Sequence, residues 1–158
     1  MAEGGSFYED FEVGRTRRHP QGRTLTDVDN IWFTLLTCNT NQIHFNSDYA
    51  RRHFAKEPFD GRLVVNSFLT LATVVGLSVD ETSRNGIMLA MKDMRVVHPV
   101  FAGDTIYAET TVLSKRESKS HRGMGIVEVR TAGLNQDGTK VLEFERTFMV
   151  RRRGGDWE

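Results

Sequence analysis

The feature that most constrains this fold is an apolar run that follows Asn66. Residues 68–77 (FLTLATVVGL) contain no charged side chain, and at helical spacing their apolar groups point in almost every direction. A helix that is apolar all round is typical of a protein core. Asn66 and Ser67 both suit the N-cap, where a side-chain oxygen accepts an unpaired backbone N–H. A buried strand is the alternative, but the run exceeds the usual length of about 4–8 residues. We therefore predict a core helix around which the rest of the chain folds.

Two further helices are predicted before this run. Thr26 can cap a helix whose first turn is acidic and whose apolar side chains recur at helical spacing. Residues 46–54 indicate a second, shorter helix, and residues 38–46 form a polar, asparagine-rich loop between the two. One strand is predicted over residues 15–25, with an interruption at Pro20.

The second half of the chain has the pattern of an antiparallel sheet. Residues 104–115 alternate between two sets of side chains, as a half-buried strand does. The connections are short, and one contains Asp137-Gly138, a hairpin signal. Helices followed by strands indicate an α+β fold, which we assign to one domain of residues 1–158. The predicted strands are residues 87–97, 104–115, 124–134 and 140–151.

Charge and spacing exclude several classes of function. The 21 Lys and Arg residues balance 21 Asp and Glu residues, so no overall field favours nucleic acid. No run approaches the roughly 20 apolar residues of a membrane helix, and the N-terminus lacks the apolar segment of a signal peptide. No spacing matches a zinc site, a phosphate loop or a serine nucleophile elbow. We therefore expect a cytoplasmic protein with no metal or other cofactor, and with no nucleic-acid or membrane partner.

The polar loop holds the residues best suited to chemistry. Asn39, Asn41 and His44 lie close together in residues 38–46. Asparagine is common in turns because its side chain bonds nearby backbone groups, and a single histidine is more often structural than catalytic. The residues alone therefore leave a structural and a functional interpretation open.

This loop resembles the hydratase motif of the MaoC-like, R-specific enoyl-CoA hydratases. That motif, Gly-Asp-x-Asn-Pro-hydrophobic-His, is similar to residues 38–44 (CNTNQIH), and residues 98–105 (HPVFAGDT) resemble the family's Pro-Val-x-x-Gly-Asp turn. The similarity extends over about residues 11–151, and the loop is closest to a branch associated with mesaconyl-CoA. The resemblance implies a hot-dog fold, in which an antiparallel sheet wraps a long helix, and a homodimer that binds acyl-CoA.

The resemblance also implies roles for individual residues. His44 matches the family's catalytic histidine and would act as general base and acid, whereas Asn39 stands where the family has aspartate. Because an amide cannot accept a proton, Asn39 is expected to orient the water instead. Ser67 replaces the family's glycine at the helix start, and its backbone N–H would stabilise the thioester oxygen. Substrate contacts are expected from Asn41, Asn66, Arg62 and Arg23, the arginines because a guanidinium binds phosphate or carboxylate in bidentate fashion.

The predicted activity is reversible hydration of a 2-enoyl-CoA thioester with a short, branched or dicarboxylic acyl group, such as mesaconyl-CoA. Two alternatives stay open. An acyl-CoA thioesterase of the same fold would place a carboxylate on or near the central helix, and residues 66–79 contain none. A non-catalytic acyl-CoA binder, or one half of a heterodimer, is favoured by Asn39 in the position of the acid.

Overall fold

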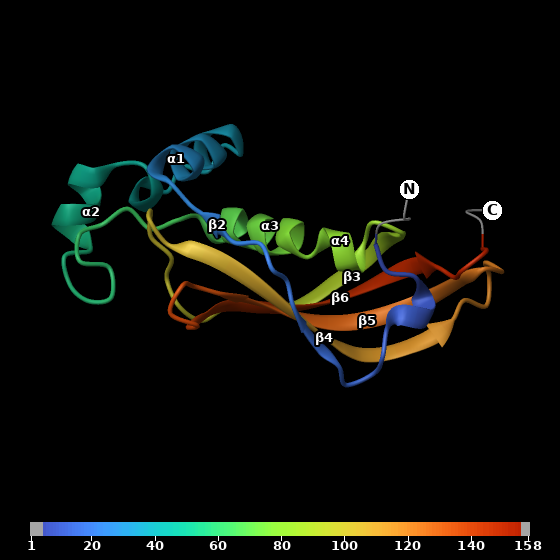
Figure 1. Cartoon of the computed structure of the whole chain (residues 1–158). Coiled ribbons are helices and arrows are strands. Elements are labelled where there is room, and N and C mark those ends of the chain that lie inside the picture. The colour runs from blue at the N-terminus through green and yellow to red at the C-terminus, as the bar shows by residue number, and fades with distance from the viewer. Residues whose placement is uncertain (1–4, 156–158) are drawn as a thin grey trace.

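The computed structural model describes residues 5–155 and confirms the α+β architecture (Figure 1). Residues 1–4 and 156–158, the ends of the predicted domain, lie outside the described residues. The elements in chain order are η1 (Tyr8–Asp10), β1 (Thr16–Arg18), β2 (Arg23–Thr24), α1 (Asp27–Leu36), η2 (Gln42–His44), α2 (Ser47–His53), α3 (Ser67–Leu77), α4 (Val79–Thr82), β3 (Gly86–Val96), β4 (Thr105–Glu117), β5 (Met124–Leu134) and β6 (Lys140–Arg151).

The strands form one antiparallel sheet in the order β1-β4-β5-β6-β3, and β2 also pairs with β4. The four long strands match their predicted bounds to within two residues. A meander, in which each strand pairs with the next, is confirmed for β4, β5 and β6 but wrong for β3, which pairs with β6 and not with β4. The single strand predicted over residues 15–25 is instead two short ones, because Pro20 lies between them and has no N–H to donate to the ladder. Strand β3 lies at one edge of the sheet.

Helix α3 packs along one face of the sheet (Figure 1). Its start confirms the predicted cap, because the Asn66 side-chain oxygen accepts a 3.0 Å hydrogen bond from the Phe68 N–H. The helix can approach β5 closely because Gly133 has no side chain, and a Cβ there would lie 2.6 Å from Val74. The core under the helix consists of Leu25, Val65, Val74, Val100, Ile106, Ala108, Val141, Leu142 and Phe144.

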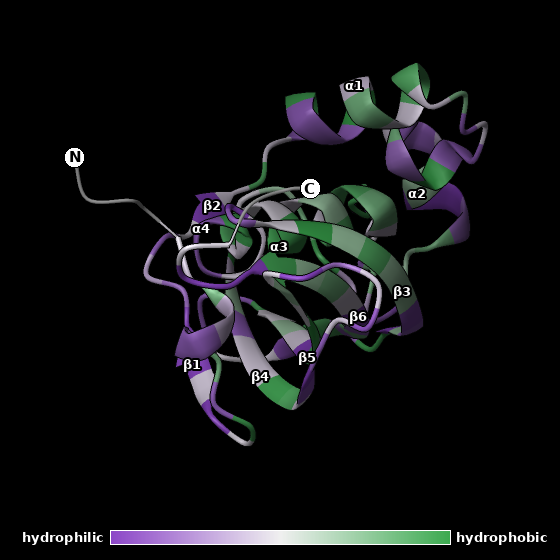
Figure 2. Ribbon diagram, turned by 90° about the vertical axis from the view of Figure 1, so that its right-hand side faces the viewer, coloured by the Kyte–Doolittle hydropathy of each residue, from purple (hydrophilic) through white to green (hydrophobic). Residues whose placement is uncertain are grey.

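The prediction that this helix is buried on all sides was wrong for one stripe. Phe68 is 63% exposed, and Ala72 and Gly76, each one turn further along, are exposed as well. We call these three residues the Phe68 stripe. The sheet of a single chain covers only one face of the helix, so its other apolar face stays open to solvent. Figure 2 shows that apolar colour continues from α3 onto the edge strand β3. The exposed apolar residues of β3 and the segment that follows are Ile87, Met88, Leu89, Val96 and Val97.

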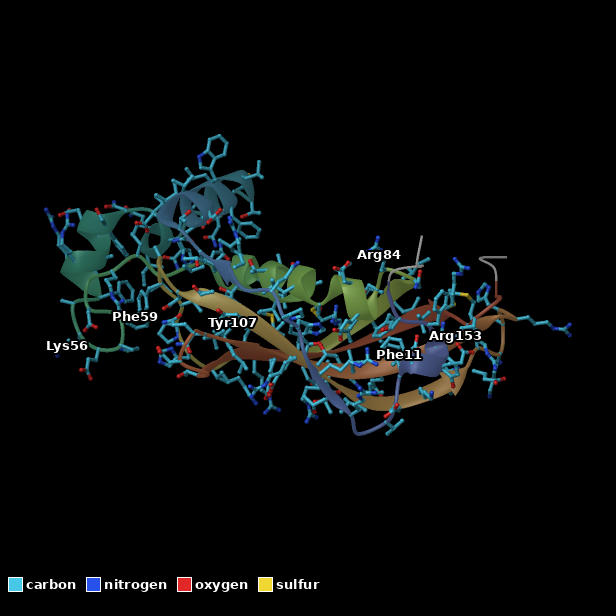
Figure 3. The ribbon with its side chains drawn as sticks, viewed as in Figure 1. Phe11, Lys56, Phe59, Arg84, Tyr107 and Arg153 are labelled. Atoms are coloured by element: carbon cyan, nitrogen blue, oxygen red, sulfur yellow. The ribbon has the colours of Figure 1, made fainter. Side chains whose placement is uncertain are left out.

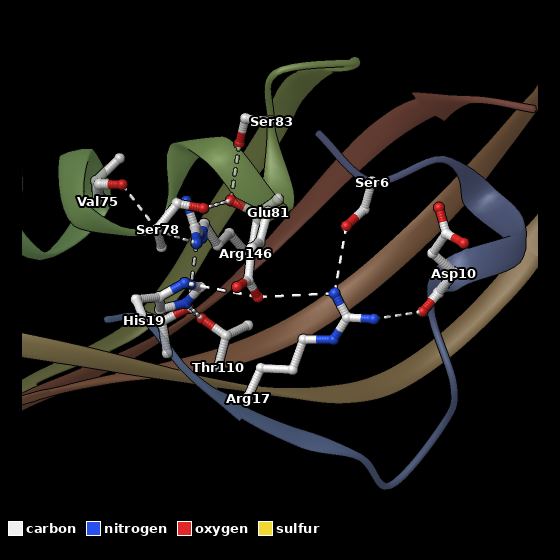
Figure 4. Close-up of polar contacts among 12 residues, drawn as sticks. Ser6, Asp10, Arg17, His19, Val75, Ser78, Glu81, Ser83, Thr110 and Arg146 are labelled. Atoms are coloured by element: carbon white, nitrogen blue, oxygen red, sulfur yellow. Dashed lines mark hydrogen bonds and ion pairs between the residues drawn. The ribbon is translucent and has the colours of Figure 1, made fainter. Parts of the chain in front are cut away.

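A buried guanidinium lies between the sheet and the α3–α4 junction (Figure 4). Arg146 of β6 is 1% exposed, and its Nη2 donates to the Ser78 Oγ at 2.7 Å and to the Thr131 Oγ1 at 3.3 Å. Burial lowers the pKa of Arg146 to about 10, because a low-dielectric site disfavours the cation. The side chain therefore stays charged at neutral pH, at a position that the sequence pattern assigned to an ordinary strand.

A buried histidine lies beside this guanidinium (Figure 4). The Nε2 of His19 lies 2.9 Å from the Thr110 hydroxyl, and its Nδ1 lies 3.7 Å from the carboxylate of Glu81 on α4. Burial lowers the pKa of His19, the Glu81 carboxylate partly opposes this, and Arg146 and Arg17 lower the pKa further. His19 is therefore held in its neutral form when the chain is folded.

This burial predicts a loss of stability in acid. Because the folded-state pKa of His19 lies below that of the unfolded chain, the unfolded state gains its proton first as pH falls through about 6.5. The free energy of unfolding should drop below that pH by up to about 1.4 kcal/mol for each unit of pKa difference. His19→Gln, which cannot titrate, should show a smaller drop in urea unfolding between pH 7.5 and pH 5. The exposed His121→Gln is the control, and an equal drop in both variants would contradict the assignment.

Candidate active site

Two asparagines shape the loop between α1 and α2. The Asn39 side-chain oxygen accepts from the Asn41 N–H at 2.9 Å, and the Asn41 side-chain oxygen accepts from the Ile43 N–H at 3.3 Å. Asn41 is thereby the N-cap of η2. These turns place His44 at the end of η2. Both asparagines therefore have a structural role in the loop, in addition to any contact with a ligand.

The orientation of His44 is fixed by a backbone carbonyl. Its Nδ1 lies 2.8 Å from the Val64 oxygen, and the ring is half-buried. A carbonyl oxygen only accepts, so the proton of the neutral ring is assigned to Nδ1 and the lone pair to Nε2. Among residues 5–155 the Nε2 has no hydrogen-bond partner, so it is the atom able to take a proton, which is the arrangement that a general base requires.

The loop is tied to α3 by the fully buried side chain of Asn30 on α1. Its Nδ2 donates to the carbonyl oxygens of His44 at 2.8 Å and of Val64 at 3.1 Å, and its Oδ1 accepts from the Asn66 N–H at 2.9 Å. One side chain therefore joins α1, η2 and the start of α3. Sequence reasoning missed Asn30, although two polar residues one turn apart, Asn30 and Thr34, stand out in an otherwise apolar helical pattern.

Helix α1 is apolar on its outside. Its buried residues are the polar pair Asn30 and Thr34, which face the loop and α3. Trp32, by contrast, is 71% exposed, on the face that a lone helix of a soluble domain would normally bury. The exposed apolar side chains of α1 are Val28, Trp32, Leu35 and Leu36. This surface, which we call the α1 apolar face, is covered by nothing in the described chain.

Ser67 opens α3 at the wall of a cavity of about 280 Å³. As the first residue of the helix it has no intrahelical acceptor for its N–H, and none is present elsewhere in residues 5–155. Val64, whose carbonyl holds His44, lines the same cavity. Val64 therefore links the two places: its carbonyl orients His44, and it lines the cavity that Ser67 lines, although His44 itself is not among the lining residues. The lining consists of Phe59, Val64, Val65, Ser67, Thr70, Val96, Val97, His98, Pro99, Val100, Val141 and Leu142.

The four residues expected to contact substrate are placed differently. The Asn66 side chain is buried between Thr34 and the Phe68 N–H, so it positions the helix start, and a contact to substrate stays a prediction. Asn41 is exposed beside His44, as its role in η2 requires. Arg62 is exposed, with its guanidinium carbon 3.7 Å above the centre of the Phe101 ring.

Arg23 is engaged by a carboxylate at the start of α1. Its Nη2 lies 2.9 Å from Asp29, whose other oxygen accepts from the Thr26 N–H and hydroxyl. These Thr26 hydrogen bonds, and the Arg23 guanidinium, hold the pKa of Asp29 below its usual range. Asp48, the other carboxylate near the loop, lies 3.1 Å from Arg52. Within the described residues neither carboxylate forms an ion pair with His44.

The C-terminal arginines lie at the opposite end of the molecule from the loop. Lys56 and Phe59 mark the end that carries α2, and Arg153 lies near Phe11 at the other end (Figure 3). Arg152 pairs with Glu9 and Glu117, and Arg153 pairs with Asp10 at 2.6 Å. Two of the three basic residues 151–153 therefore form ion pairs with acidic residues near the N-terminus. They are not part of the His44 site.

Within residues 5–155, no group of three or more His, Cys, Asp or Glu side chains is placed to hold a metal ion. None of the helices in that range is long and apolar enough to cross a membrane. The side chains at the site supply an imidazole, amides and hydroxyl groups, a set suited to proton transfer and hydrogen bonding.

Comparison with known sequences identifies a family. A family model described as mesaconyl-CoA hydratase matches residues 1–156. The chain is 33% identical to the mesaconyl-CoA hydratase of Cereibacter sphaeroides, over 94% of this chain and 42% of that protein. It is 27% identical to the (R)-specific enoyl-CoA hydratase of Rhodospirillum rubrum, over 94% of both chains. The chain thus spans less than half the length of the first of these relatives.

Comparison with solved structures confirms the hot-dog fold. The crystal structure of a MaoC-domain dehydratase from Chloroflexus aurantiacus superposes with a TM-score of 0.85 and 31% identity, over 94% of this chain and 41% of that one. A Mycobacterium tuberculosis protein with a double hot-dog fold, Rv0216, gives a TM-score of 0.83 at 21% identity, over 100% of this chain and 47% of that one. The described chain corresponds to one hot-dog unit of the latter.

The Asn30 contacts predict a large effect of a single substitution. Asn30→Ala would leave the His44 carbonyl and the Asn66 N–H without their partner, whereas the Val64 carbonyl would keep its contact to the His44 ring. Each unpaired buried group costs about 1–3 kcal/mol, so the free energy of unfolding should fall by at least about 2 kcal/mol. Urea unfolding measures this. Asn41→Ala, at an exposed position with one long hydrogen bond, should cost less than about 1 kcal/mol, and similar losses would contradict the prediction.

Proposed function

This chain belongs to the mesaconyl-CoA hydratase family, and from that premise we propose that it is an enzyme that reversibly hydrates a 2-enoyl-CoA thioester. The observation that carries the proposal is the orientation of His44. Its Nδ1 is held by the Val64 carbonyl, which leaves Nε2 to take a proton, and Val64 also lines the cavity where the Ser67 N–H is unpaired. We infer from this link that the base and the oxyanion donor act on one ligand.

In this proposal, water lies between His44 and Asn39. The Nε2 of His44 removes a proton as the water oxygen attacks C3 of the double bond, and the electrons move onto the thioester oxygen. The Ser67 N–H and the positive end of α3 stabilise that charge. The imidazolium then gives the proton to C2, which completes addition of one water. Asn39 orients the water with the part of its side chain that the Asn41 N–H leaves unused.

The proposed substrate carries a short, branched or dicarboxylic acyl group, of which mesaconyl-CoA is the example that the family name supports. A cavity of about 280 Å³ suits a short chain. We assign Arg62 and Arg23 to the CoA phosphates or a second carboxylate, since both guanidinium groups are exposed. Asn41 and the backbone at Asn66 are proposed to contact substrate as well.

Two alternatives remain testable. Asn39, in place of the acid, favours a non-catalytic acyl-CoA binder or one half of a heterodimer. A thioesterase has less support, because α3 carries no carboxylate and Glu81 of α4 faces His19 and Arg17. We keep a cytoplasmic location, and an enzyme with no metal or other cofactor, as predictions.

We further propose that the chain is a homodimer. The mesaconyl-CoA hydratase of Cereibacter sphaeroides is more than twice as long as the matched segment, and a second copy would occupy the place of the remainder. The α1 apolar face, the Phe68 stripe on α3 and the edge strand β3 are apolar and uncovered. Several large apolar side chains exposed on neighbouring elements are typical of an interface.

The role of His44 is tested by substitution. His44→Ala should lower kcat for hydration by at least about 100-fold, because general acid–base catalysis contributes that much or more. The assay follows loss of the conjugated-enoyl absorbance with crotonyl-CoA and, separately, mesaconyl-CoA. His121→Ala, at an exposed histidine, should keep wild-type activity. Full activity in a folded His44→Ala protein would overturn the mechanism, and an inactive wild type that still binds acyl-CoA would favour the binder.

The homodimer is tested by sedimentation. The wild-type chain should sediment at twice the mass of one chain, and Trp32→Ser together with Phe68→Ser should shift it toward the monomer. Val13→Ser is the matched control, because Val13 is 61% exposed but belongs to none of the apolar surfaces named above. A wild-type chain that stays monomeric at high concentration would refute the proposal.

A further inference from the structure

We propose that the hydroxyl of Thr70 is a second hydrogen-bond donor to the thioester oxygen, beside the N–H of Ser67. This inference rests on the proposed hydratase function and adds a catalytic residue to it. Thr70 lies on α3 and lines the same cavity as Ser67.

The first observation is an unpaired buried hydroxyl. Thr70 is 3% exposed, and within the described residues its Oγ1 has no hydrogen-bond partner. The other buried hydroxyl groups near α3 and α4 are all paired: Thr34 accepts from Asn66, Thr82 donates to the Ser78 carbonyl, and Thr110 pairs with Thr131. Buried polar groups without partners are rare, and each calls for an explanation such as a ligand or a catalytic role.

The second observation is position. Thr70 lies three residues after Ser67, so the two share one face of the helix and the same cavity wall. Helical side chains lean toward the N-terminus and cover the preceding turn. The Thr70 side chain therefore leans toward the turn that begins with the unpaired Ser67 N–H. In this proposal both donors point to the thioester oxygen. The negative charge of the enolate is then stabilised by two hydrogen bonds and not by the Ser67 N–H alone.

The hydroxyl oxygen is covered in the unliganded chain, so its donation to a ligand requires rotation about Cα–Cβ. Threonine in a helix divides between two rotamers, and the change moves the hydroxyl, together with the methyl group, to a different staggered position. The thioester oxygen of the substrate gains negative charge in the cavity, and it is the acceptor to which the Thr70 hydroxyl would donate. No covalent bond to Thr70 forms, and its proton stays on the hydroxyl.

The surroundings strengthen such a bond. The cavity lining is apolar except for Ser67, Thr70 and His98, and it contains no carboxylate or ammonium group. A hydrogen bond to a charged oxygen is stronger in a low-dielectric site than in water. The same lining leaves few competing acceptors for the hydroxyl.

The test compares Thr70→Val, which keeps the shape but removes the hydroxyl, with Thr70→Ser, which keeps the hydroxyl. With crotonyl-CoA, Thr70→Val should lower kcat by about 100-fold with KM within a few-fold of wild type, as loss of one oxyanion donor does. Thr70→Ser should retain kcat within a few-fold. In urea unfolding, Thr70→Val should be at least as stable as wild type, because it removes an unpaired buried hydroxyl.

A second readout does not depend on turnover. The infrared carbonyl band of crotonyl-CoA labelled with ¹³C at the thioester carbon should move to lower frequency on binding to wild type, and less so on binding to Thr70→Val. An inactive wild type that shifts the band further than Thr70→Val does would refute the hydratase function while supporting Thr70 as a donor. The inference is overturned if Thr70→Val keeps wild-type kcat and band position, if Thr70→Ser loses as much as Thr70→Val, or if wild type shifts no band.

Discussion

The candidate site depends on the buried side chain of Asn30. Its three hydrogen bonds hold the His44 carbonyl, the Val64 carbonyl and the Asn66 N–H at fixed places around one amide. The Val64 carbonyl also holds Nδ1 of His44, so the same amide fixes the ring through the backbone. Because a buried amide with unpaired groups is costly, the loop has little freedom to leave this arrangement. The base and the start of α3 are thereby positioned before any ligand arrives.

This requirement explains why α1 is polar inside and apolar outside. Its inner face must bind backbone groups of two other segments, so Asn30 and Thr34 lie there. Its apolar side chains are left on the outer face, where a surface of this kind is stable in water only if another surface covers it. The Phe68 stripe of α3 is also apolar and exposed, so the same condition applies to the central helix. The positioning of the site and the α1 apolar face thus both follow from the sequence of one short helix.

The chain also separates its buried charge from its cavity. Arg146, His19 and Glu81 gather near the α3–α4 junction, where Arg146 donates to Ser78, His19 pairs with Thr110, and Glu81 faces His19. The cavity at the other end of α3 is lined mainly by apolar residues, and its lining contains no carboxylate, ammonium or guanidinium group. A neutral lining lets the helix dipole and the two donors at Ser67 and Thr70 act on a ligand with little screening.

The sequence by itself determined the helices α1, α2 and α3, the four long strands, the cap at Asn66 and the loop that carries His44, but not α4 or the short helices η1 and η2. These follow from periodicity and from capping and turn residues, which act over a few positions. The same pattern, through its resemblance to MaoC-like hydratases, identified the family. Only the tertiary structure decided that Asn30 ties the loop to α3 and that Val64 orients His44. It also decided that α3 has an open face and that the Thr70 hydroxyl is unpaired. The reason is physical: these contacts join residues 14 to 36 positions apart, and no local pattern records which buried group meets which partner.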